Sequence, residues 1–136
     1  MKQILMIILA VVLVGCGAKQ QKVLDAHNRI VAAEKTYAEE VQTALKGDNL
    51  PATIQAVKRF LGVVQNSNTE DLPEDYIHAI ELLEKSLNEM ISFLESVNDP
   101  AKVDWQKLQA LDSGRLHAII NLNAAAQNNG LEMLGP

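Results

Sequence analysis

Residues 71–97 carry the pattern that most constrains what this chain can fold into. Their large apolar residues recur at alternating intervals of four and three positions: Tyr76, Ile80, Leu83, Leu87, Met90, Leu94 and Val97. This spacing forms one apolar stripe along a helix, and such a stripe is typically buried by neighbouring helices that cross at a shallow angle. Asp71 is predicted to cap this helix, with Pro73 in its first turn and Glu74 completing a capping box. The segment therefore predicts one helix of a helical bundle.

Three further segments show helical periodicity, and none shows the sustained alternation typical of a strand. The first covers residues 19–46 and ends at Gly47, which can adopt the left-handed conformation that terminates many helices. The second opens at Leu50-Pro51, because proline is tolerated in a first turn, and the last runs from about Asp104 to Asn128. We predict an all-α fold, an up-down-up-down four-helix bundle over residues 19–128.

The last of these helices contains an interruption. Its apolar residues are expected to be buried on both sides of the interruption: Trp105, Leu108, Leu111, Leu116, Ile119, Ile120 and Leu122. Between them, residues 112–115 include Gly114, a poor helix former, so either a kink or a second helix capped by Asp112 is expected. Asp112 and Arg115 are candidates for pairing across a groove or contacting a partner, the alternative being a solvated kink. Trp105 is a candidate interface anchor, the alternative being that it closes the end of its own core.

The first residues have the pattern of an export signal. Lys2 precedes an unbroken apolar run from Ile4 to Val14. As a helix this run is about 16 Å long, which is too short to span the roughly 30 Å core of a bilayer but suits the core of a signal peptide. The run leads directly into Leu13-Val14-Gly15-Cys16.

These four residues resemble the lipobox of bacterial lipoproteins, in which a small residue precedes an obligatory cysteine. The resemblance covers about the first 17 residues and implies a diacylglycerol group on Cys16, cleavage after Gly15 and acylation of the new amino group, so that the chain binds the bilayer through Cys16. The residue after Cys16 is Gly17 and not aspartate. In this the chain is similar to lipoproteins of the outer membrane, which face the periplasm, if the host is Gram-negative. The alternative is an ordinary signal peptide, or a short membrane helix, with a chance cysteine.

Cleavage at this point would define the remaining organisation. Residues 1–15 form the signal peptide, residues 16–18 the lipidated N-terminus with a short tether, and residues 129–136 the C-terminal tail. Loss of Lys2 changes the formal net charge from -5 to -6, which disfavours binding to nucleic acid phosphates. The lipobox resemblance implies an extracytoplasmic location, and the short tether predicts that the bundle stays near the membrane surface.

Few residues suggest a ligand or catalytic site. His27 and His117 are the candidates for facing each other inside the bundle and binding haem or a metal, although neither has a second ligand at helical spacing and the chain has no Cys-x-x-Cys-His motif. The acidic residues at 70–75 are explained by stabilisation of a helix N-terminus. Glu34 lies seven residues from His27, about 10 Å along a helix, so the two cannot form a direct acid–base pair. We expect no enzyme and no cofactor other than the lipid on Cys16.

These observations predict a membrane-anchored lipoprotein of the cell envelope that binds or scaffolds protein. An alternative is a bundle that binds haem, a metal or a small apolar ligand between its helices. A third is self-association through the stripe of residues 76–97. The identity of an envelope partner is not encoded in any motif of the sequence.

Overall fold

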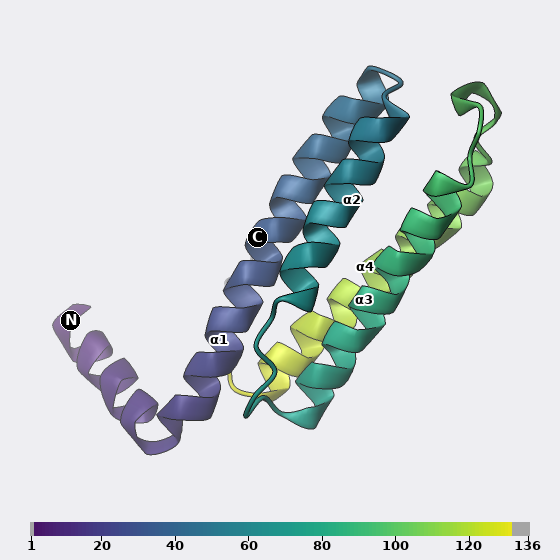
Figure 1. Ribbon diagram of the computed structural model, residues 1–136. Coiled ribbons are helices and arrows are strands. Elements are labelled where there is room, and N and C mark those ends of the chain that lie inside the picture. The colour runs from purple at the N-terminus through teal and green to yellow at the C-terminus, as the bar shows by residue number, and fades with distance from the viewer. Residues whose placement is uncertain (1, 132–136) are drawn as a thin grey trace.

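The structure is a computed structural model that describes residues 2–131, with side chains described from residue 17 onward. Its elements are α1 (Lys2–Lys46), α2 (Leu50–Gln65), α3 (Glu74–Glu95), the 3-10 helix η1 (Pro100–Lys102) and α4 (Trp105–Asn128). Successive α-helices run in opposite directions and form an up-down-up-down bundle (Figure 1). The described residues contain no strand, and the predicted all-α four-helix bundle is confirmed.

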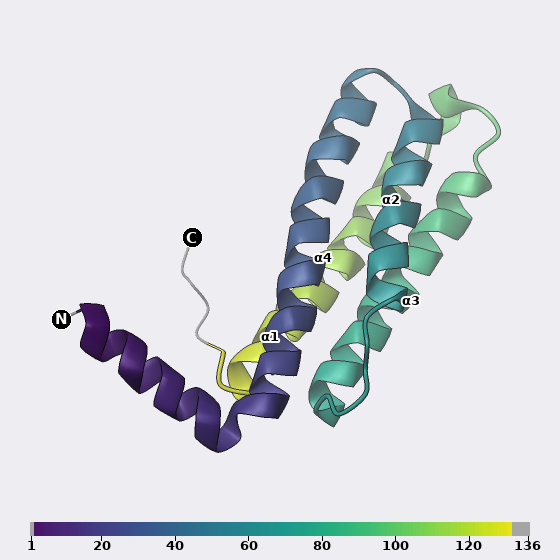
Figure 2. The ribbon, with the colours of Figure 1, turned by 60° about the vertical axis from the view of Figure 1, so that its left-hand side comes forward.

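Helix α1 begins at Lys2, whereas the apolar periodicity predicted a helix over residues 19–46. A tether was expected at residues 16–18, but these residues belong to α1, which bends sharply between its first part and the part within the bundle (Figures 1 and 2). No proline lies between residues 2 and 46, so nothing in the sequence removes a backbone donor or blocks the helical conformation there. The first part of α1 projects away from the bundle, and the rest packs within it (Figures 1 and 2).

The predicted lipidation site is only partly described. Residues 13–16, the predicted lipobox, lie in the helical backbone of α1 but outside the residues whose side chains the structure describes. Within the described part of the chain, no helix offers an apolar stretch long enough to cross a membrane.

The turn between α1 and α2 differs in detail from the prediction. The left-handed conformation falls on Asp48, at φ 48°, and not on Gly47. Aspartate is one of the residues that tolerate this region, because its short polar side chain can bond locally. Asn49 then caps α2 by accepting a hydrogen bond from the backbone N–H of Ala52 at 3.0 Å.

The predicted cap of α3 is wrong. Asp71 does not precede the first helical turn: it adopts φ 62° in the connecting loop, and Pro73 precedes Glu74 without any side-chain cap. The Asp71 carboxylate instead pairs with Lys22 of α1, at 2.6 Å between Oδ2 and Nζ. Glu74 and Asp75 lie in the first turn, where the helix dipole stabilises their negative charge.

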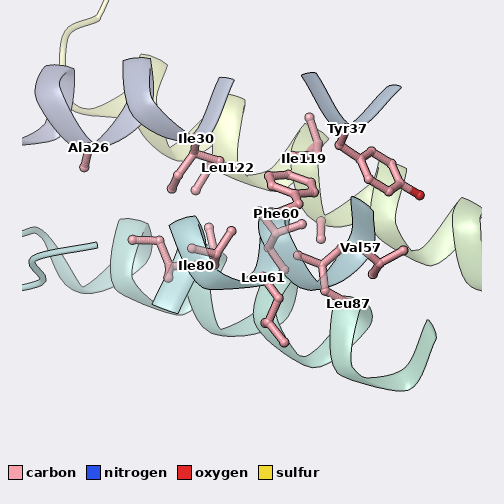
Figure 3. Packing of buried hydrophobic residues seen from close by; sticks show 14 of the residues in the cluster. Ala26, Ile30, Tyr37, Val57, Phe60, Leu61, Ile80, Leu87, Ile119 and Leu122 are labelled. Carbon is pink, nitrogen blue, oxygen red and sulfur yellow. The ribbon is translucent and has the colours of Figure 1, made fainter. Parts of the chain in front are cut away.

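All four helices contribute to one apolar core. The predicted stripe of α3 is buried from Tyr76 to Leu94, and Figure 3 shows residues of the other helices packed around it: Ile30 of α1, Phe60 of α2 and Leu122 of α4. No described core residue precedes Val23 or follows Ala126. The chain from residue 16 therefore carries every described element of the core.

The two helical hairpins, α1–α2 and α3–α4, separate toward one end of the bundle. At the end near residue 17, Gln20 of α1 donates a hydrogen bond to the carbonyl of Gly130 at 2.8 Å. From there α1 and α4 diverge toward the end that holds the α1–α2 and α3–α4 connections (Figures 1 and 2). We call this the distal end, because it lies farthest from residue 16 along α1.

The divergence overturns two predictions about α4. Leu116 and Ile120 were expected to be buried, but they are 45% and 60% exposed. They lie one and two turns after Asp112 on the same side of α4, where no helix covers them. Ile119 and Leu122, on the side toward the core, are buried as predicted.

Candidate functional site

The separated hairpins leave an apolar cleft at the distal end, which we call the distal cleft. It consists of two adjoining hollows of about 480 Å³ and about 330 Å³. Both hollows are lined by the same group of residues from all four helices: Leu45, Thr53, Leu94, Trp105 and Leu108. Volumes of this size are typical of sites that hold a small ligand or a side chain of a partner.

Trp105 lies at the opening of this cleft and was expected to close the core. Instead its side chain is 54% exposed, because it is the first residue of α4, after the cap formed by Asp104. At this point α4 has already diverged from α1 (Figure 2). An exposed tryptophan beside an apolar hollow is the type of residue that anchors protein interfaces.

The floor of the smaller hollow contains a buried cation. Arg115 has a side chain that is 8% exposed, and its Nε donates to Asp112 Oδ1 at 2.8 Å. Its Nη1 donates to Glu34 Oε1 of α1 at 3.2 Å. The guanidinium also lies over the ring of Tyr37, at 4.9 Å from the ring centroid. We call these four residues the Arg115 cluster.

The Arg115 cluster joins α4 to α1 beside the distal cleft. Burial opposes the charge of Arg115, but the hydrogen bond to Asp112 and the nearby Tyr37 and Glu34 outweigh it and raise the pKa of the guanidinium. Burial also raises the pKa of Tyr37 to about 12, so its hydroxyl stays neutral. Arg115 is therefore a fixed cation whose charge two carboxylates already balance.

Residues 112–115 do not interrupt α4. The helix is continuous from Trp105 to Asn128, and the predicted kink or second cap is wrong. Gly114 faces Ser86 of α3, and a Cβ added at Gly114 would lie 3.6 Å from Ser86 Oγ, an ordinary van der Waals distance. Asp112 bonds to Arg115 and not to a helix N-terminus.

The two histidines proposed as ligands lie in different environments. His27 is buried against α3, with its Nδ1 3.1 Å from Tyr76 Oη, and burial lowers its pKa. His117 is exposed midway along α4. His27 Nε2 is buried without a hydrogen-bond partner among the described residues. No group of three or more His, Cys, Asp or Glu side chains in that part of the chain could hold a metal ion.

Sequence spacing alone suggests no partner for Glu34 other than His27. The structure pairs Glu34 with Arg115, 81 positions away, and no spacing rule connects residues so far apart. The cleft was also missed, since it depends on the angle between two hairpins and not on any local pattern. The i,i+3 spacing of Asp112 and Arg115 was the one local signal of the cluster.

Comparison with known proteins finds no match to this chain among protein-family models, curated proteins or solved structures.

Proposed function

We propose that this chain is a lipid-anchored protein of the cell envelope that binds another protein through the distal cleft. The lipobox at residues 13–16 and the preceding apolar run support the anchor. The observation that carries the binding role is the distal cleft itself, an apolar hollow with the half-exposed Trp105 at its opening. The function proposed is recognition of a partner.

The position of the cleft supports this role. From Cys16 to Lys46 the helix α1 is continuous, which corresponds to about 45 Å at 1.5 Å per residue. The anchor would therefore lie at one end of the bundle and the cleft at the other. This arrangement presents the cleft away from the attachment point, where a second envelope protein can reach it.

Site-specific photo-crosslinking in cells tests the proposal. A photoreactive amino acid is placed at Gln109, which lines the smaller hollow, and in a matched strain at Glu81, on the exposed face of α3. We expect a discrete protein adduct from position 109, none from position 81, and loss of the adduct in a Cys16→Ser variant. Equal adducts from both positions, or none from either, would contradict the proposal.

The anchor has its own test. Metabolic labelling with an alkyne fatty acid should mark the protein in the membrane fraction, and Cys16→Ser should abolish the label. Persistence of both the label and membrane association in the variant would refute lipidation at Cys16.

A small apolar ligand is the second candidate occupant of the cleft. The smaller hollow, about 330 Å³, falls at the lower end of small-molecule pocket volumes. Native mass spectrometry of the purified protein would show such a ligand as a defined mass increase, which a Trp105→Ala variant should lose. A visible absorbance band would point to haem in place of an apolar ligand.

A further inference from the structure

The exposed large apolar residues lie mainly on two of the four helices. Five of the six such residues in the described chain belong to α1 and α4, and the sixth, Val63, lies on α2. We call the five residues the apolar strip: Val31, Leu45, Trp105, Leu116 and Ile120. A set of large apolar side chains gathered on one face, and not scattered, marks a surface that another molecule covers.

The strip is elongated along the bundle axis. Val31 and Leu45 are fourteen positions apart, two heptads, and so share one side of α1. Their separation along the helix is about 21 Å, the length of roughly four helical turns. Leu116 and Ile120 are spaced by one turn of α4, and Leu45 and Trp105 both line the distal cleft. Two of the five residues of the strip thus line the cleft.

Shape favours a helix as the occupant. A narrow apolar surface between two helices, with side chains at heptad spacing, is the surface onto which an amphipathic helix packs. An apolar side chain near the end of such a helix could enter the distal cleft beside Trp105. A compact apolar ligand would fill the cleft but leave Val31 and Ile120 uncovered.

Charge then selects the kind of helix. The charged residues that line the cleft are Asp48, Asp99, Asp112 and Arg115. The Arg115 charge is balanced by Glu34 and Asp112, and Asp99 forms only a long, solvent-exposed ion pair with Lys102, at 3.9 Å. The chain without residues 1–15 has a formal net charge of -6, because only Lys2 is lost from a total of -5. A second copy of this chain and a membrane rich in anionic lipid would both be repelled, whereas a cationic partner would be attracted.

From these observations we infer that the apolar strip and the distal cleft together receive an amphipathic helix of about four turns whose polar face carries Lys or Arg. This inference rests on the proposed function and names the chemistry of the partner. The apolar side chains of that helix cover Val31, Leu116 and Ile120, and one of them fills the cleft. Its basic residues lie near Asp48 and Asp99.

Two synthetic peptides of about fourteen residues test the inference. They share one pattern of leucines at helical spacing, and all the remaining positions are Lys in one peptide and Glu in the other. The protein is the chain from residue 16 with Cys16→Ser, whose cooperative unfolding is checked first. Trp105 is the single tryptophan, so a blue shift of its emission reports coverage of the cleft.

We expect saturable one-to-one binding of the Lys peptide and at least about tenfold weaker binding of the Glu peptide, a difference in line with close interfacial charge pairs. Ile120→Ser should weaken binding about tenfold, as expected for an apolar contact of this size, and Val31→Ser should also weaken it. Val63→Ser, the matched exposed valine on α2, should leave binding unchanged. Asp48→Asn with Asp99→Asn should weaken binding several-fold and reduce its dependence on salt.

Five results would overturn the inference. Equal binding of both peptides would remove the role of charge, and an equal effect of Val63→Ser would remove the role of the strip. A dimer of the free chain that Ile120→Ser dissociates would make a second copy the occupant. A blue shift with phosphatidylglycerol vesicles that Ile120→Ser abolishes would make it a lipid surface. If position 109 crosslinks to a protein but the Lys peptide does not bind, the proposed function stands and this inference fails.

Discussion

Replacing Arg115 by methionine tests the account of how α4 is held to α1. Methionine has a similar length and retains the apolar part of the packing, but it removes the cation from Asp112, Glu34 and the Tyr37 ring. The side chain of Arg115 is 8% exposed, while those of Glu34 and Asp112 are 25% and 43% exposed. The carboxylates left behind can therefore regain some contact with water.

The partial exposure of Glu34 and Asp112 determines how much stability Arg115→Met should lose. Breaking a fully buried ion pair costs about 3–5 kcal/mol, and hydrogen bonds to charged groups contribute about 1.5–3 kcal/mol. Because both carboxylates reach solvent, we expect Arg115→Met to lower the free energy of unfolding by about 2 kcal/mol. For a domain of this size that loss lowers Tm by roughly 8 °C.

Chemical denaturation of the chain from residue 16 measures the effect, with Lys58→Met as the matched control. Lys58 pairs with Glu95 at the surface, where both side chains are over 40% exposed, so the control should lose less than about 1 kcal/mol. A double-mutant cycle with Glu34→Gln should show a coupling to Arg115 of about 1 kcal/mol. If Arg115→Met and Lys58→Met cost the same, the Arg115 cluster does not join the helices as described.

Three more predictions follow from single contacts. Burial lowers the pKa of His27, so the unfolded chain binds a proton more readily than the folded chain below pH 6.5. The free energy of unfolding should therefore fall as pH drops from 6.5 toward the folded-state pKa. Denaturation curves measured from pH 7.5 to 5 should show a smaller fall for His27→Gln, and an unchanged slope would contradict the prediction. Gly114→Ala should stabilise by about 0.5–1 kcal/mol, because an added Cβ lies at an ordinary contact distance from Ser86 and alanine is the better helix former, whereas Gly114→Leu should destabilise by forcing α4 away from α3; equal melting temperatures for the two variants would refute this packing. Trp105 should be readily quenched by acrylamide in the free protein, and shielding comparable to a buried tryptophan would contradict its place at the cleft opening.

The sequence predicted the parts of the fold that depend on one helix at a time. The four-and-three spacing of α3 predicted its buried side, because it places the large apolar residues along a single side of the helix. The ends of α2 followed from Pro51 and from the polar residues after Gln65. These features rest on local spacing and on residue chemistry alone.

Helix α4 shows what local spacing cannot decide. Its apolar residues occupy a wide part of the helix circumference. Burial of Leu116, Ile120 and Trp105 therefore depends on how closely α1 packs against that part of α4. The distance is set by the divergence of the hairpins, which no short pattern encodes. The prediction that these three residues are buried was wrong for this reason.

Polar residues near the core were misread for a related reason. The sequence places Arg115 in an expected interruption, because Gly114 is a poor helix former and the residues around it are polar. In the structure the Arg115 guanidinium donates a hydrogen bond to Glu34. The two residues are 81 positions apart, so no helical spacing pattern predicts their contact. Asp71 looked like a cap, but Lys22 on a neighbouring helix offers its carboxylate a direct partner.

Chemical-shift mapping of a bound partner tests the central claim most directly. The isotope-labelled chain from residue 16 is titrated with the protein that crosslinks at position 109, or with the Lys peptide, while its backbone amide resonances are followed. The account predicts that the largest changes fall on α1 and α4 around Leu45, Trp105 and Leu116, with little change on the outer face of α3. Changes centred on that outer face or around Val63 would contradict it.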